Sequence, residues 1–140
     1  MKLMSLNCRD LGQHEAVLEV RSLVQLHRPL VVFLSETRLF SNNAEGLRRS
    51  LGFPNGVGFG TFGHGGGLAL LWMNEVCVKL QSYDKLHIDV MVVDPTSGEE
   101  RWRFTGFYGE ARRELRYRSW ELLHFRAMHH GCALGISTKY

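Results

Sequence analysis

The chain has 140 residues, 44% hydrophobic and 22% charged, so it can bury one hydrophobic core and falls in the size range of a single domain. Its apolar runs are far shorter than the roughly 18 to 20 residues that cross a bilayer, and its start does not resemble a signal peptide. We therefore expect an intracellular protein, nuclear or cytoplasmic, with no membrane span. The net charge of +3 is too small to indicate a nucleic-acid partner by itself.

The first elements predicted in chain order are a strand, a helix and a second strand. Residues 2–7 have the pattern of a short strand, and apolar residues at helical spacing between Ala16 and His27 predict an amphipathic helix that stops before Pro29. Residues 30–34 are apolar throughout, which is typical of a strand buried on both faces. A strand–helix–strand unit favours a parallel pair.

Further along, residues 41–51 predict a short helix with Gly52 in its C-terminal turn. Four strands are predicted next, joined as an antiparallel meander with a turn at residues 94–98. Residues 114–128 have the pattern of a final helix, and no element is predicted after Gly131. The four strands are expected at residues 67–72, 76–83, 87–93 and 101–108.

Two polar residues, Asn7 and Glu36, come at the ends of the first two predicted strands. The carboxyl ends of parallel strands meet at one edge of a sheet, where ligands commonly bind. A carboxylate there suits Mg²⁺, which prefers oxygen ligands, keeps several waters and completes its shell with substrate phosphate. Polar residues also end many strands for solubility alone, so position by itself favours a structural role.

Five segments together resemble one known family, because they follow one another in its order and spacing. They read MSLNCR at residues 4–9, VFLSETR at 32–38, GGLALLW at 66–72, HIDV at 87–90 and WRFTGFYGE at 102–110. The chain resembles the endonuclease/exonuclease/phosphatase superfamily over roughly residues 1–125. Within it, the chain looks most like the endonuclease domain of plant LINE-type retrotransposons, and RSWELL at residues 118–123 fits the helix that follows.

This resemblance implies a mixed α/β (α+β) fold, the N-terminal part of a two-sheet β-sandwich flanked by helices. It implies that Asn7 orients the catalytic groups and the phosphate, that Glu36 is a Mg²⁺ ligand, and that Tyr108 lies beside the phosphate. Hydrolysis in the family also uses an Asn/His pair and an Asp that activates water. Those groups belong to Gly-Asp-Phe-Asn and Ser-Asp-His blocks, and neither block occurs in this sequence.

Two positions depart from the family, which has Trp at Leu6 and Gly at Asp10. The second change is the more serious, because a glycine there permits a positive backbone torsion or close approach to substrate. An aspartate also adds negative charge near an incoming phosphate. We interpret Asp10 as drift rather than as an additional metal ligand.

Several other motifs have simpler interpretations than the functional one. Residues 58–63 match a dinucleotide fingerprint, yet they follow no strong parallel strand and open no helix. His87 and Asp89 share a strand face, and a hydrogen-bonded surface pair is the expected role. The number and spacing of the cysteines favour buried thiols over a disulfide framework. Four possible zinc ligands near the end are better interpreted as part of a disordered polar tail, and they are His124, His129, His130 and Cys132.

The leading hypothesis is therefore a truncated Mg²⁺-dependent phosphodiesterase domain at residues 1–128, without useful nuclease activity, followed by a non-family tail at residues 129–140. The alternative is a non-catalytic domain that binds DNA or RNA or another partner, aided by the arginines near the end. A third possibility is an enzyme completed by another chain. Because the family packs two sheets and this chain is expected to supply little beyond one, an uncovered apolar sheet face and self-association are also expected.

Overall fold

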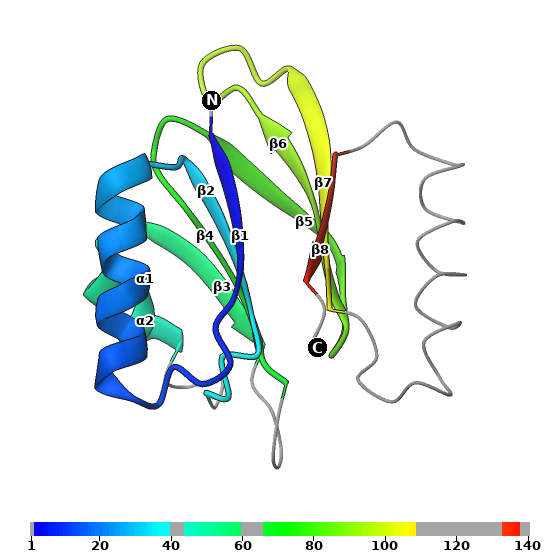
Figure 1. Cartoon of the computed structure of the whole chain (residues 1–140). Coiled ribbons are helices and arrows are strands. Elements are labelled where there is room, and N and C mark those ends of the chain that lie inside the picture. The colour runs from blue at the N-terminus through cyan, green and yellow to red at the C-terminus, as the bar shows by residue number, and fades with distance from the viewer. Residues whose placement is uncertain (1, 40–43, 60–65, 109–132, 138–140) are drawn as a thin grey trace.

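The structure is a computed structural model of the 140-residue chain, and it describes residues 2–39, 44–59, 66–108 and 133–137. In these segments eight strands form two sheets that lie face to face, with two helices on the outer side of one sheet (Figure 1). The elements are β1 (Leu3–Asn7), α1 (His14–His27), β2 (Val31–Ser35), α2 (Ala44–Leu51), β3 (Asn55–Phe59), β4 (Leu68–Trp72), β5 (Cys77–Tyr83), β6 (His87–Val93), β7 (Glu100–Tyr108) and β8 (Ala133–Ser137). The predicted final helix falls outside the described residues.

The first sheet has the strand order β1-β2-β4-β3. Strands β1 and β2 are parallel, as predicted, and β4 is antiparallel to both β2 and β3. Helix α1 connects the parallel pair and ends before Pro29: Arg28 has a left-handed backbone with φ of 48°, and its N–H donates to the Val24 carbonyl at 2.8 Å. The carboxyl ends of β1 and β2 therefore lie at the same edge.

The second sheet has the order β5-β6-β7-β8. Strands β5, β6 and β7 form an antiparallel meander, and β8 is parallel to β7. The predicted four-strand meander is wrong in one respect, because β4 belongs to the first sheet. Hydrophobic patterning indicates that a segment is a strand, but it does not indicate which sheet the strand joins.

Two strands were not predicted. Strand β3 lies in a glycine-rich segment, and at Gly58 a Cβ atom would come within 2.4 Å of the Ala44 Cβ, so glycine permits α2 to pack closely on the sheet. Strand β8 lies in the segment that the sequence pattern left as a polar tail, and its backbone pairs with residues 104–108. The domain boundary placed at residue 128 stays a prediction.

The core between the sheets takes side chains from both. Phe33 of β2 packs edge-on against Phe104 of β7, with ring centroids 6.0 Å apart. At Gly106 of β7 a Cβ atom would come within 2.4 Å of the Phe33 ring, so this glycine permits the close approach of the two sheets. The described chain thus supplies both layers of the sandwich, and the expectation that it supplies little beyond one sheet is wrong. The buried residues of this core are Val31, Phe33, Leu68, Leu70, Val76, Ile88, Val90, Val92, Phe104 and Tyr108.

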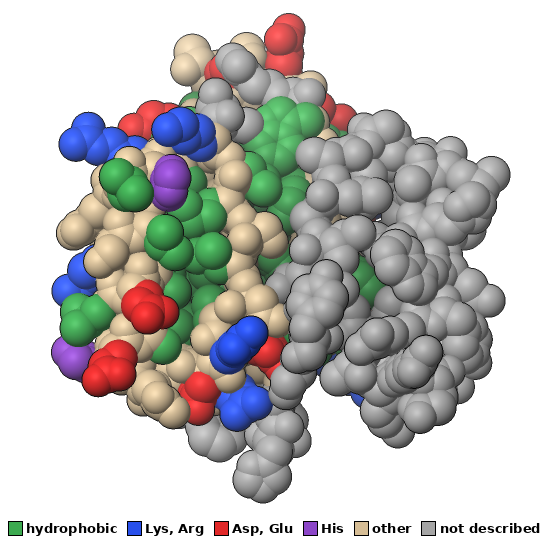
Figure 2. Space-filling model, viewed as in Figure 1, with side chains coloured by type: hydrophobic (Ala, Val, Ile, Leu, Met, Phe, Trp, Pro, Cys, Tyr) green, Lys and Arg blue, Asp and Glu red, His purple; other side chains and the backbone are tan. Residues whose placement is uncertain are grey.

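The outer face of the first sheet is also covered. Leu47 and Leu51 of α2 and Val20 of α1 join Val32 and Leu34 of β2 in a second buried cluster. Among the described residues, a partly apolar groove lies between α1 and β1, where Figure 2 shows a strip of hydrophobic side chains. Self-association through an apolar surface stays a prediction. The groove between α1 and β1 is lined by Lys2, Leu3, Met4, Leu6, Leu23, His27 and Pro29.

Within the described residues, no helix is long and apolar enough to cross a bilayer.

Candidate active site

The carboxyl ends of β1 and β2 carry the first two predicted site residues. Asn7 is in register with Ser35, the residue before Glu36. Beyond the strands the two segments continue side by side: the Cys8 N–H donates to the Ser35 carbonyl at 2.9 Å, and the Leu11 N–H donates to the Thr37 carbonyl at 2.9 Å. The structure therefore places Asn7 beside the backbone that presents Glu36.

The third predicted site residue, Tyr108, ends β7 in the opposite sheet. Its hydroxyl donates a hydrogen bond of 2.8 Å to Glu36 Oε1, although the two residues lie 72 positions apart in the sequence. Both side chains are buried, with 1% of Glu36 and 7% of Tyr108 exposed. This bond joins the two sheets at the edge where β1 and β2 end. The geometry brings the three predicted site residues to one edge of the molecule.

The backbone at this edge is strained. Arg9, Glu36 and Arg38 have φ values of 60°, 51° and 52°, in the left-handed region that non-glycine residues rarely adopt. Such conformations cost on the order of 1 kcal/mol or more each and cluster at functional sites. Their presence on both segments distinguishes this edge from the regular strands beside it.

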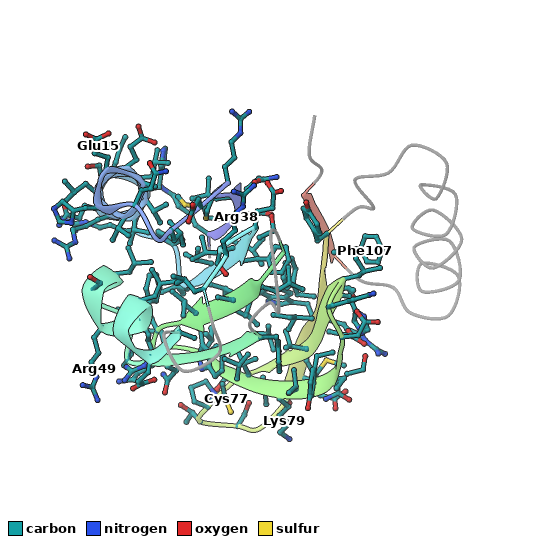
Figure 3. The ribbon with its side chains drawn as sticks, turned by 90° about the horizontal axis from the view of Figure 1, so that it is seen from below. Glu15, Arg38, Arg49, Cys77, Lys79 and Phe107 are labelled. Carbon is teal, nitrogen blue, oxygen red and sulfur yellow. The ribbon has the colours of Figure 1, made fainter. Side chains whose placement is uncertain are left out.

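The segment after β2 is also held from its other side. The N–H groups of Thr37 and Arg38 donate to the carbonyls of Gly67 and Gly66, at 3.2 and 2.9 Å. Gly67 has φ of +90°, and a Cβ atom there would lie 2.4 Å from Thr37 Oγ1, so glycine permits this contact. Figure 3 views the molecule from this end, with Arg38 labelled on the first sheet and Phe107 on the second. Glu36 is thus presented by a backbone fixed on both sides.

Asp10 has a local structural role. Its Oδ1 accepts a hydrogen bond of 2.8 Å from the Gly12 N–H, which stabilises the turn before α1. The positive torsion in this turn falls on Arg9 and not on Asp10. The aspartate therefore requires no glycine-like backbone, and what remains of the departure from the family is its negative charge.

The Cys8 thiol lies close enough to the Glu36 carboxylate for its negative charge to affect the pKa of the thiol. Burial raises the pKa of the Cys8 thiol to about 12, and the negative charge of Glu36 contributes in the same direction. The sulfur is therefore a protonated thiol near neutral pH rather than a thiolate. Cys8 and Cys77 are both free cysteines, and both are half-buried rather than buried as predicted.

His87 and Asp89 form part of a buried network, so the expectation of a surface pair is wrong. Asp89 is fully buried and accepts hydrogen bonds from Arg103 Nε at 2.9 Å and Thr105 Oγ1 at 3.0 Å. His87 Nε2 lies 3.0 Å from the Ser82 hydroxyl. Strand alternation places both residues on one face, but it does not tell whether that face is covered.

None of the remaining sequence motifs forms a metal or nucleotide site within the described residues. No three His, Cys, Asp or Glu side chains gather there as metal ligands. His124, His129, His130 and Cys132 lie outside that part of the chain. Gly58 and Phe59 of the glycine-rich motif belong to β3, which is antiparallel to β4, and residues 60–63 of the motif lie outside the described residues.

Two sheets packed face to face, with polar residues at the strand ends, define a fold shared with metal-dependent nucleases and phosphatases. A sequence profile described as "Endonuclease/Exonuclease/phosphatase family" matches residues 4–131. The chain belongs to this family, as the resemblance predicted. No curated protein matches the sequence significantly.

Solved structures show the same fold at low sequence identity. The human Nocturnin catalytic domain is 15% identical, with a TM-score of 0.66, over 97% of this chain and 62% of that one. The 3'-5' exonuclease from Neisseria meningitidis is 18% identical, with a TM-score of 0.64, over 100% of this chain and 57% of that one. The endonuclease domain of TRAS1, a telomere-specific non-LTR retrotransposon, is 10% identical, with a TM-score of 0.59, over 97% and 57%. The chain thus spans about three fifths of the length of these structures.

Proposed function

We propose that this chain forms the metal- and phosphate-binding part of a Mg²⁺-dependent phosphodiesterase domain of the endonuclease type. The observation that carries the proposal is the hydrogen bond from the Tyr108 hydroxyl to the buried Glu36 carboxylate across the two sheets. It places an acidic and a phenolic group, with Asn7 nearby, at the edge where strained backbone gathers. Strained backbone conformations cluster at ligand sites, which supports a ligand-binding role for this edge.

The donor atoms fit a hard cation. Glu36 offers carboxylate oxygens, which are the ligands that such a cation prefers. Mg²⁺ is commonly held by one or two carboxylates together with waters and substrate phosphate, so a cluster of protein ligands is not required. When bound, the cation would polarise a phosphoryl oxygen as a Lewis acid. Glu36 is the residue that would hold it.

The other residues of the site position the substrate. Tyr108 donates to Glu36 Oε1 and thereby fixes the orientation of that carboxylate. The Asn7 Oδ1 accepts a hydrogen bond of 3.1 Å from the Arg9 N–H, which orients the amide at the end of β1. The Asn7 amide nitrogen is then the group that donates to a phosphate oxygen.

Hydrolysis needs further groups. Loss of one general acid or base typically lowers the rate on the order of 10²- to 10⁴-fold, and the Gly-Asp-Phe-Asn and Ser-Asp-His blocks do not occur in these 140 residues. We therefore propose that the chain binds Mg²⁺ and a phosphodiester but cleaves it slowly or not at all by itself. DNA is the first substrate to test, because one structural neighbour is described as bound to a product DNA hairpin.

Calorimetric titration of the purified chain with Mg²⁺ tests the binding part of this proposal. We expect one saturable site, and we expect Glu36→Gln to weaken it at least tenfold, because the carboxylate loses its charge while its shape is kept. Glu45→Gln is the matched control, since it removes an exposed carboxylate from α2 and should leave the titration unchanged.

Incubation with supercoiled plasmid and Mg²⁺ tests the catalytic part. We expect the plasmid to stay intact. Nicking by the wild-type chain that disappears in Glu36→Gln would show a complete active site and contradict the proposed loss of catalysis. Equal Mg²⁺ binding by the wild type and Glu36→Gln would contradict the metal site itself.

A further inference from the structure

An aromatic pair lies at the same end of the sandwich as the Glu36–Tyr108 bond. Phe59 ends β3 and Tyr83 ends β5, one strand from each sheet. Their rings are stacked, with centroids 4.0 Å apart and an angle of 10° between the planes. Tyr83 is nevertheless 54% exposed. We call Phe59 and Tyr83 the aromatic pair.

Strand register places the aromatic pair relative to the site in the first sheet. Phe59 is paired with Leu68 of β4, and Leu68 with Ser35, which precedes Glu36. Strand β3 is therefore two strands away from β2. Neighbouring strands are about 4.8 Å apart, so the backbone of Phe59 lies roughly 10 Å across the sheet from the backbone beside Glu36.

The second sheet repeats this arrangement. Tyr83 is paired with Ile88 of β6, and Ile88 with Gly106 of β7, two residues before Tyr108. Strand β5 is thus also about two strand spacings, roughly 10 Å, from the strand that carries Tyr108. The Glu36–Tyr108 bond and the aromatic pair both connect the two sheets, at opposite sides of the same end. A strand of nucleic acid can span such a distance within one or two nucleotides.

Exposed cations accompany these two features. Lys85 follows Tyr83 by two residues, and Arg9 and Arg38 lie on the two strained segments beside Glu36. Figure 3 shows Arg38 at this end of the molecule. Basic side chains that flank an exposed aromatic surface are the combination that binds single-stranded nucleic acid, through phosphates and stacked bases respectively. A small phosphomonoester without a base could not stack on the aromatic pair.

We propose that the aromatic pair stacks an unpaired base of a nucleic-acid strand whose phosphate occupies the Glu36 site. Phe59 supports the inner face of the Tyr83 ring, and the base packs against the exposed part of Tyr83. This deepens the proposed function, on which it rests, and it predicts a preference for strands with unpaired bases over duplex DNA. The binding is independent of base identity, because every base presents an aromatic face.

The test is fluorescence anisotropy with a labelled single-stranded oligothymidylate and the full chain in Mg²⁺, with the length of the oligonucleotide checked on a gel afterwards. Tyr83→Ala should weaken binding about tenfold, and Tyr83→Phe should restore it, because the ring and not the hydroxyl makes the stack. Leu80→Ala is the control, since it removes an apolar side chain that is 40% exposed on the same strand. It should leave affinity unchanged.

A second oligonucleotide with abasic sites separates stacking from phosphate binding. Wild type and Tyr83→Ala should bind it equally weakly. The proposal is overturned if the wild type does not bind the oligothymidylate, if Tyr83→Ala binds it as the wild type does, or if Tyr83→Ala loses affinity equally for both strands. Titration with Mg²⁺ tests the Glu36 site separately, because Tyr83→Ala should not alter Mg²⁺ binding.

Discussion

Two buried carboxylates, Glu36 and Asp89, lie in contrasting regions of the molecule. Asp89 is in the middle of β6, and Arg103 and Thr105 of the neighbouring strand β7 donate to it. Glu36 follows β2 on a left-handed backbone, and the Tyr108 hydroxyl reaches it from the opposite sheet. A carboxylate neutralised by the adjacent strand is part of the sheet itself. Glu36 is presented on strained backbone at the carboxyl end of a strand, the position in which ligands commonly bind in such sheets, and this is where we propose a ligand site.

The largest expected effect on stability comes from removing the charge of Asp89, the structural carboxylate. Asp89→Asn removes the negative charge that pairs with the Arg103 guanidinium in a buried network, so we expect a loss of about 3 kcal/mol in the free energy of unfolding, measured by urea denaturation. Glu36→Gln should change it by less than about 1 kcal/mol, because the amide oxygen still accepts from Tyr108. If Glu36→Gln destabilises the protein as much as Asp89→Asn, Glu36 is a structural residue and the comparison fails.

A smaller effect compares the two hydroxyl donors. Thr105→Val and Tyr108→Phe each remove one hydrogen bond to a buried carboxylate, and each should cost about 1 kcal/mol of stability. Only Tyr108→Phe should also weaken Mg²⁺ binding in calorimetry, because only Tyr108 orients Glu36. Weaker Mg²⁺ binding by Thr105→Val would show that the two carboxylates are coupled.

The smallest effect concerns Asp10. Asp10→Asn keeps an oxygen acceptor for the Gly12 N–H and removes one negative charge near the site. We expect unchanged stability and an affinity for single-stranded DNA that rises about twofold at low salt, and this gain should disappear as salt is added. An affinity that falls on this substitution would show that the Asp10 carboxylate takes part in binding.

The sequence predicted the parallel pair, and the position of Asn7 and Glu36 at one of its edges, because both follow from local pattern. An uninterrupted apolar run indicates a strand buried on both faces, and the polar residues Asn7 and Glu36 come directly after the two strands. Tyr108 has no such signal. It ends a strand far along the chain, and only the resemblance to the family associated it with the site.

Other features depend on partners distant in the sequence, so local pattern does not contain them. The place of β4 in the first sheet follows from its pairing with β2 and β3, and the side-chain partners of the buried Asp89 come from the neighbouring strands β5 and β7. The sequence pattern did not predict strand β3, because its glycines, which close packing under α2 requires, are poor strand formers. The stack of Phe59 on Tyr83 joins the edges of two sheets, and periodicity along one strand cannot report it.

The contact between Gly106 and Phe33 links the interior of the sandwich to its rim. Gly106 precedes Tyr108 by two residues and Phe33 precedes Glu36 by three, so the thickness of the core at this contact sets how far the phenol must reach to the carboxylate. A bulkier residue in place of this glycine would move β7 outward and widen the gap at the rim. A residue buried in the interior therefore affects the width of the rim, and a larger side chain at position 106 should lengthen the distance between the Tyr108 hydroxyl and Glu36.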